Sequence, residues 1–208
     1  MNSIIYDPSQ KRTMTLTGRG QVSLIPDMAV IRLGVELRGP DLEEVQVQNA
    51  KQSQALLEAL GKMGISDVNT FQYTIDKHFE NVNDTPVQRG YTVRNIYEIR
   101  IHDTDKVGTV IDEAVRAGAN AVDLISFEAS DPERYYLQAL NLAVDEAIGK
   151  AKSIAGELDI QIDPVPVSIT EVSSMPISAM PLQREAANTP IIPGNITIEA
   201  NINAEFSY

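Results

Sequence analysis

The 208-residue chain carries 17 Lys and Arg against 29 Asp and Glu, a formal net charge of -12 at pH 7. This acidic balance repels phosphate backbones and anionic lipid, so it argues against nucleic-acid binding and against docking on a membrane surface. The sequence contains no cysteine, which excludes disulfides, thiolate metal sites and cysteine nucleophiles.

We interpret residues 1–12 as an N-terminal tail. Their short apolar patch, IIY, is smaller than the roughly 7–15-residue apolar core of a signal peptide. The sequence has no apolar run of about 18 residues, the length that a membrane-spanning helix needs. We therefore expect a cytoplasmic protein; the alternative is a periplasmic or extracellular protein whose signal peptide has been removed.

The first predicted elements are two strands, residues 14–24 and 29–37, with apolar side chains at alternate positions. The intervening Pro26 and Asp27 are typical of a turn. We therefore expect the two strands to pair with each other as a hairpin.

The first strand contains a Gly-x-Gly pair, Gly18 and Gly20, which could be taken for a nucleotide-binding loop. A dinucleotide fingerprint needs a third glycine and then a helix. Here Ser23 occupies the third position and the strand alternation continues through Leu24. We interpret the two glycines as making room for a closely packed neighbour, and we expect no cofactor.

A helix is predicted next, beginning at the N-cap Asp41 and ending before Gly64. Two long alternating runs follow, at 68–79 and 91–101, with residues 81–90 as the loop between them. At about 3.3 Å per residue, a strand of this length reaches roughly 40 Å. Such a hairpin protrudes from a small domain and needs a partner.

The second half of the chain is predicted to alternate helices with strands. Helix 104–117 precedes a short strand within 121–130. Asp131, followed by proline, begins the longest helix, which carries alanines at every fourth position and ends at 156. Small residues in such a row allow a helix to lie close to a sheet.

The last elements are a strand at 165–172, a proline-rich loop or arm at 176–193 and an unbroken alternating strand at 195–208. The order is β-β-α-β-β-α-β-α-β-β. Hairpins mixed with helices indicate an α+β fold with a largely antiparallel sheet, long hairpins and three helices packed on the sheet.

Candidate chemistry is sparse. Asp76, His78 and Glu80 share one face of a strand and are weak candidates for a metal site, but alternate strand residues are nearly 7 Å apart. We interpret them as a solvated polar face. A nucleophile elbow, a phosphate loop with its lysine and a His-Glu-x-x-His pair are absent from the sequence, so we expect a protein that is not an enzyme.

Three segments, taken in order, resemble the SIMPL-domain family of bacterial proteins. They are the opening GRGQVSLIPDMAVIRLGVE, the block from AVRAGANAVDLISFEAS to AKSIAGEL, and the final TPIIPGNITIEANINAEFSY. The resemblance covers residues 13–208 and implies an α/β protein that can assemble into large homo-oligomers, with envelope-associated members and some linked to oxidative stress. It supplies no catalytic residue.

Three functional hypotheses remain at this point, and the one with the least support is a hydrolase or metalloenzyme that uses the carboxylates and His78. In the first, the long hairpin and its unpaired strand edge make the chain a non-enzymatic protein that assembles with itself. In the second, it is a small-molecule or peptide-binding module with a ligand between helices and sheet, or an extended peptide along a strand edge.

Overall fold

The computed structural model describes residues 12–172, 191 and 193–208, which form two compact units. The smaller unit contains the described parts of residues 1–24, 131–178 and 196–208, and the larger unit those of residues 25–130 and 179–195. The element order and the antiparallel sheets confirm the predicted α+β fold. The predicted tail, apart from Arg12, and most of the predicted proline-rich arm lie outside the described residues.

The sheet of the smaller unit has the strand order β1-β7-β6, with β1 at Thr13–Leu24, β7 at Ile196–Ser207 and β6 at Ser168–Glu171. β1 and β7 pair without interruption, from Thr13 opposite Ser207 to Leu24 opposite Ile196. The predicted pairing of the first two strands is therefore wrong. β1 and β2 belong to different sheets, and the alternating apolar positions of β7 match those of β1 over its whole length.

Helix α3, Pro132–Glu157, covers the apolar face of this sheet, and its alanine row makes the approach close. A Cβ atom added at Gly20 would lie 1.8 Å from the carbonyl oxygen of Ala139, and one added at Gly18 would lie 1.9 Å from that of Ala143. No side chain fits in these gaps. The prediction that the two glycines admit a closely packed neighbour is confirmed, and the neighbour is the backbone of α3.

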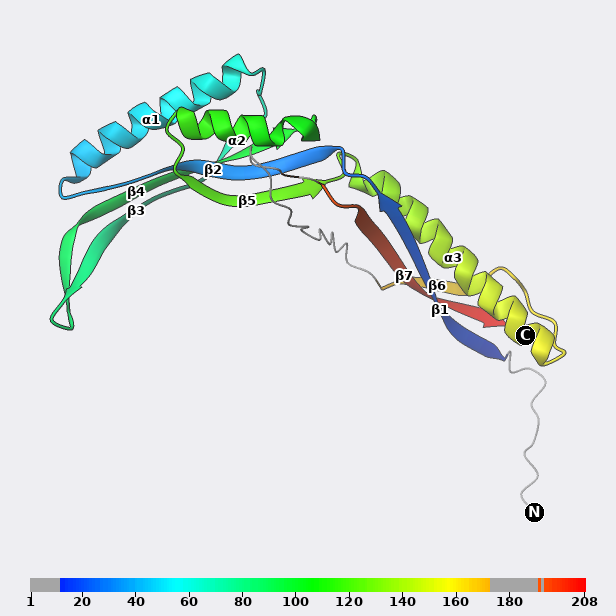
Figure 1. Cartoon of the computed structure of the whole chain (residues 1–208). Helices are drawn as coiled ribbons and strands as arrows, with labels where there is room; N and C mark the ends of the chain where they lie inside the picture. The colour runs from blue at the N-terminus through cyan, green and yellow to red at the C-terminus, as the bar shows by residue number, and fades with distance from the viewer. Residues whose placement is uncertain (1–11, 173–190, 192) are drawn as a thin grey trace. The chain divides into compact units, whose positions relative to one another are not determined.

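The sheet of the larger unit has the order β3-β4-β2-β5 and is antiparallel throughout. Its strands are β2 (Met28–Gly39), β3 (Val68–Val82), β4 (Thr85–Ile101) and β5 (Ala121–Glu128). Helices α1 (Leu42–Lys62) and α2 (Val107–Arg116), the latter preceded by the 3₁₀ turn η1 (Thr104–Lys106), lie on the same face of the sheet (Figure 1).

The hairpin of β3 and β4 is longer than predicted. Pairing continues to Val82 opposite Thr85, so the expected loop at 81–90 is a two-residue turn. Asn83 and Asp84 occupy it with φ of 51° and 60°. Asn and Asp adopt this left-handed conformation readily, and two such residues form the turn that suits the twist of a hairpin. The tip of the hairpin lies away from both helices of its unit (Figure 1).

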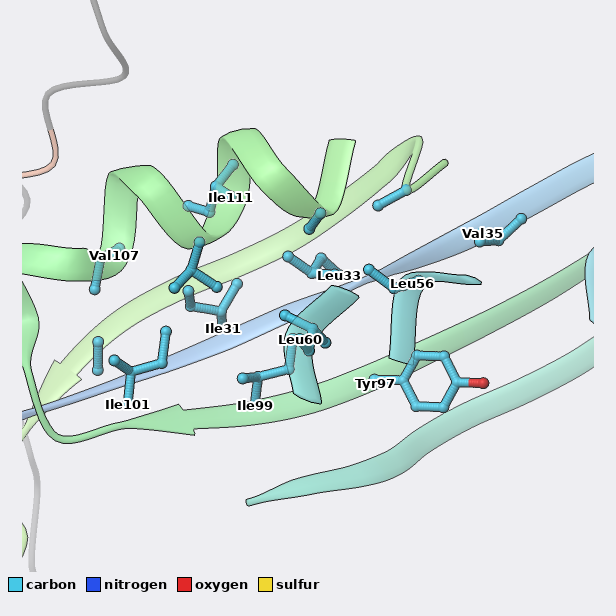
Figure 2. Packing of buried hydrophobic residues seen from close by; sticks show 14 residues of the cluster. Ile31, Leu33, Val35, Leu56, Leu60, Tyr97, Ile99, Ile101, Val107 and Ile111 are labelled. Atoms are coloured by element: carbon cyan, nitrogen blue, oxygen red, sulfur yellow. The ribbon is translucent and has the colours of Figure 1, made fainter. Parts of the chain in front are cut away.

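The core of the larger unit lies between this sheet and its two helices (Figure 2). Alternate residues of β2, from Ala29 to Val35, are fully buried, as are Leu56 of α1, Ile99 of β4 and Val107 of α2. Because β2 has a sheet neighbour on both sides, even its opposite face is shielded at Val30 and Gly34.

Helix α1 is capped as the sequence predicts, and it buries two polar residues against the sheet. Asp41 accepts a hydrogen bond from the Glu44 backbone at 2.9 Å, and Gly64 ends the helix with φ of 78°. Leu57, an apolar residue of this helix, is exposed. Instead, Asn49 and Ser53, from the polar middle of the helix, are buried against the sheet.

Candidate assembly surface

Strand β3 forms an edge of the sheet in the larger unit, because β4 is its only partner strand among the described residues. Large apolar side chains on this strand stay exposed to solvent: Phe71 (47%), Tyr73 (49%), Ile75 (39%) and Phe79 (52%). An exposed strand edge with apolar side chains is a template for pairing with another chain, and apolar patches of this kind mark interaction sites.

The register of β3 on β4 determines which face each of these side chains occupies. Tyr73 and Ile75 lie opposite Asn95 and Val93, on the face that carries the helices, and the Tyr73 hydroxyl accepts a hydrogen bond of 3.4 Å from Gln46 of α1. A register shift between Thr70 and Gln72 leaves Phe71 as an extra residue. Such a bulge changes the side-chain alternation.

Because of this bulge, the Phe71 ring lies on the opposite face of the sheet, where it meets Arg32 of β2. The Arg32 guanidinium carbon is 3.8 Å from the ring centroid, a cation–π contact. Arg32 also forms an ion pair of 2.8 Å with Glu98, its cross-strand partner on β4. The edge strand β3 is therefore attached to the central strands in two ways, by the contact of Phe71 with Arg32 and by its backbone hydrogen bonds to β4.

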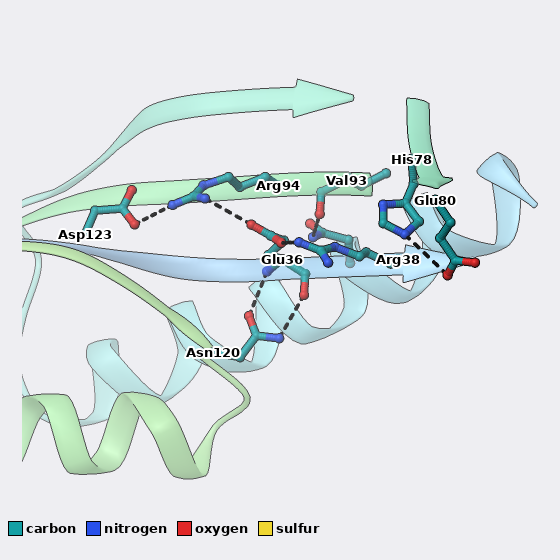
Figure 3. A network of polar contacts seen from close by, with 9 residues as sticks. Glu36, Arg38, His78, Glu80, Val93, Arg94, Asn120 and Asp123 are labelled. Atoms are coloured by element: carbon teal, nitrogen blue, oxygen red, sulfur yellow. Dashed lines mark hydrogen bonds and ion pairs between the residues drawn. The ribbon is translucent and has the colours of Figure 1, made fainter. Parts of the chain in front are cut away.

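Arg94 of β4 lies at the centre of a polar network on this second face (Figure 3). It pairs with Glu36 of β2 at 3.0 Å and with Asp123 of β5, so one guanidinium joins three strands. Glu36 also pairs with Arg38 at 2.8 Å. The side-chain amide of Asn120 donates a hydrogen bond to the Glu36 carbonyl and accepts one from the Glu36 N–H. It thus replaces the backbone of a neighbouring strand and extends the β2–β5 ladder beyond the start of β5.

The network is a structural feature of the sheet in which opposite charges face each other. Arg100 adds a pair of 2.6 Å with Glu98, next to the one made by Arg32. Beneath these side chains, Val30 and Ile96 are buried. Sequence reasoning missed the network. The sequence does contain a sign of it, because Arg32, Glu36 and Arg38 alternate with apolar residues on the second predicted strand. The residues that pair with these charges depend on the strand register, which the sequence does not reveal.

The three predicted site residues lie near the end of the hairpin, and the structure brings two of them together. His78 Nε2 is 4.0 Å from Glu80 Oε1, while the other Glu80 oxygen pairs with Arg89 at 3.3 Å. Asp76 lies opposite Thr92 on β4. Within residues 12–172, 191 and 193–208, no three His, Asp or Glu side chains gather closely enough to hold a metal ion.

A hollow of about 400 Å³ lies between α1 and α2 on the solvent side of the larger unit. It is lined by apolar residues such as Ala59 and Met63 and by the charged residues Glu58, Lys62 and Glu113. Ligand sites are mostly apolar clefts with a few polar groups. This hollow has an open, charged lining, so it is a weaker candidate for the predicted binding module than the edge of β3.

The smaller unit has its own polar cluster on the sheet face that is not covered by α3. Glu199 of β7 accepts hydrogen bonds from Arg19 at 2.5 Å, Asn201 at 2.8 Å and Gln21 at 2.8 Å. These three hydrogen bonds stabilise the charged carboxylate, that of Arg19 most of all, and lower the pKa of Glu199 from 4.5 to about 2. The ionised carboxylate therefore joins β1 to β7.

We expect the smaller unit to lose stability in acid partly through Glu199. Because the folded pKa lies below the unfolded one, the carboxylate contributes stability above about pH 4–5, and this contribution falls as the pH approaches 2. Urea midpoints measured from pH 6 to pH 2 should fall less steeply for Glu199→Gln than for the parent. Parallel curves for the two proteins would contradict this role of Glu199.

None of the helices in the described part of the chain is both long and apolar enough to cross a membrane. Comparison with known families establishes the relationship of the whole chain. A model of the SIMPL family, described as "Protein of unknown function (DUF541)", matches residues 14–206. The chain belongs to the SIMPL family. The match runs from β1 to β7 and so includes parts of both units, and the predicted resemblance is confirmed.

Curated relatives of this SIMPL chain come from bacteria. A "26 kDa periplasmic immunogenic protein" of Brucella melitensis is 26% identical over 215 residues, which covers 95% of this chain and 85% of the relative. The "Uncharacterized protein YggE" of Escherichia coli K12 is 23% identical over 178 residues, which covers 84% of this chain and 72% of the relative. The expectation of a cytoplasmic location gains no support from these names.

Proposed function

We propose that this SIMPL protein is a non-enzymatic protein that assembles with copies of itself and that the β3–β4 hairpin supplies the contact. The observation that carries the proposal is the 15-residue edge strand β3 with its exposed Phe71, Tyr73, Ile75 and Phe79. A free strand edge of this length and apolar character is normally covered or paired. When two identical chains pair about a two-fold axis, the β3 edge of each chain covers the β3 edge of the other.

The charged residues of the larger unit support a structural function. The arginines at the centre of its sheet are paired with carboxylates of neighbouring strands, an arrangement that ties strands together. A catalytic acid or base needs a position from which it reaches a substrate. A family described as being of unknown function is consistent with this proposal.

The test is the molar mass in solution. Light scattering on the purified protein at tens of micromolar should give a multiple of 22.8 kDa. Replacing Tyr73 and Phe79 together by lysine should shift the protein to smaller species, because burial of two aromatic side chains contributes about 3–6 kcal/mol and its loss raises the dissociation concentration at least about 100-fold.

Val115 provides a matched control, because it is 52% exposed on α2, outside the hairpin. Val115→Lys should leave the molar mass unchanged, and circular dichroism should show that all variants are folded. A monomeric parent protein would contradict self-assembly. It would favour the second hypothesis, in which the edge of β3 accepts an extended peptide.

We propose a periplasmic location, on the basis of the name of the Brucella relative, whose match covers 95% of this chain. Fractionation of the bacterium that makes the protein should recover it with the contents released by osmotic shock. Recovery with the cytoplasmic fraction would contradict this location.

A further inference from the structure

The pairing of β3 with β4 is regular only over a short central stretch. Register shifts fall between Thr70 and Gln72 and between His78 and Phe79. From Gln72 to His78 the seven residues lie opposite Ile96 to Gly90 without interruption, and Ile75 is the middle one. Bulges disrupt a ladder and bend a strand, so this stretch is the part of β3 whose outer edge best suits a further strand.

We infer that two copies of this protein pair through the Gln72–His78 stretch of β3, antiparallel and about a two-fold axis at Ile75. The inference rests on the proposed self-assembly and names its contact. The two four-stranded sheets become one sheet of eight strands, with β3 of each copy at its centre. The partner of the exposed edge is thus the same edge of a second copy.

Symmetry restricts the registers that are available. A two-fold axis normal to the sheet keeps the helix-bearing faces of both copies on one side, so only residues on the same face can lie opposite each other. Tyr73, Ile75 and Lys77 share one face by their alternation, while Thr74 and Asp76 share the other. A register centred on Asp76 would place two aspartates directly opposite each other, and one centred on Lys77 would place two lysines opposite each other. Like charges in directly opposite positions destabilise a strand pair.

The register centred on Ile75 gives every residue of the stretch a suitable partner. Ile75 meets Ile75 of the second copy, and Tyr73 meets Lys77, whose ammonium can lie over the ring. Thr74 meets Asp76, and Gln72 meets His78, both pairs able to form hydrogen bonds. The exposed fractions of Tyr73 and Ile75, 49% and 39%, show how much surface is available for this contact.

Lys77 explains why the pairing is specific. A lysine on an edge strand opposes indiscriminate pairing, because its charge must stay solvated or meet a suitable group. In the Ile75-centred register it lies opposite Tyr73, with no like charge directly opposite it. The same side chain therefore opposes the register centred on Lys77 and tolerates the one centred on Ile75, which is also the register that pairs all seven residues of the regular stretch with one another.

Cysteine cross-linking tests the register directly, because the chain contains no cysteine of its own. Ile75→Cys should form a covalent dimer with a short thiol–thiol cross-linker, since directly opposite Cβ atoms lie about 4.5–5.5 Å apart. Tyr73→Cys and Lys77→Cys should not cross-link alone, because each residue is four positions, or about 13 Å, from its own copy. Mixed together, these two variants should cross-link.

Val122→Cys is the matched control, because Val122 is 45% exposed on β5, the other edge of the same sheet. Strong cross-linking of Ile75→Cys, at least tenfold above Val122→Cys, is the expected result. If the parent protein is a multimer but Ile75→Cys does not cross-link, or Val122→Cys does so equally, the β3 contact is wrong while self-assembly stands. A monomeric parent protein overturns both.

Discussion

Gly20→Ala is expected to destabilise the smaller unit by about 3 kcal/mol or more, at the upper end of the usual cost of overpacking. The added Cβ would lie 1.8 Å from the carbonyl oxygen of Ala139 and 2.7 Å from the backbone nitrogen of Ala143. Both obstacles are backbone atoms of α3, so no side chain can rotate out of the way. The helix has to move away from the sheet, and its buried alanines lose their contacts.

Thermal unfolding followed by circular dichroism measures this effect. For a chain of about 200 residues, a loss of 3 kcal/mol lowers the midpoint by roughly 6–12 °C. Amide hydrogen exchange should place the loss in β1, β7 and α3, with the protection of the larger unit unchanged.

Gly149→Ala supplies the matched control within α3 itself. A Cβ at Gly149 would meet no atom within 4 Å, so the change only adds a good helix former. It should stabilise the protein by about 0.5–1 kcal/mol. If Gly20→Ala were as well tolerated as Gly149→Ala, the close approach of α3 to β1 would be wrong.

The two glycines illustrate how far the sequence alone leads. Period-two alternation around Gly18 and Gly20 was enough to predict a strand and a close neighbour. It could not identify the neighbour or the pairing of β1, because alternation shows which face is apolar and carries no information on which strand lies alongside. Pro26 and Asp27 suggested a hairpin, yet the chain passes from one sheet to the other there.

The exposed edge of β3 could be predicted from the sequence only in part, because alternation does not reveal how strands are aligned. The long hairpin is visible in the alternation of β3 and β4, although its turn is shorter than predicted, because Asn83 and Asp84 both adopt the left-handed conformation that a two-residue turn requires. The position of Phe71 on the second face depends on a bulge, and the contacts of Arg94 depend on the registers of three strands. Such features arise only when strands are aligned.

Asn49→Ala is expected to destabilise the larger unit by about 1–3 kcal/mol, because it removes two hydrogen bonds that a buried side chain donates to backbone carbonyls of the sheet. The Asn49 side-chain amide donates to Val35 O at 2.9 Å and to Val93 O at 3.1 Å. These carbonyls belong to β2 and β4, which are neighbours in the sheet. Ser53 donates to the Asn49 oxygen at 3.3 Å and holds the amide in position.

Gln48→Ala changes a neighbouring, exposed side chain of the same helix and should alter the free energy of unfolding by no more than about 0.5 kcal/mol. Urea unfolding of both variants gives the comparison. Equal stabilities would show that the two carbonyls do not need Asn49. A loss confined to Asn49→Ala would mean that Asn49, in the polar middle of α1, fixes the position of the helix across β2 and β4. The α1 residue Gln46, which donates to Tyr73, is thereby held beside the edge strand on which the proposed assembly depends.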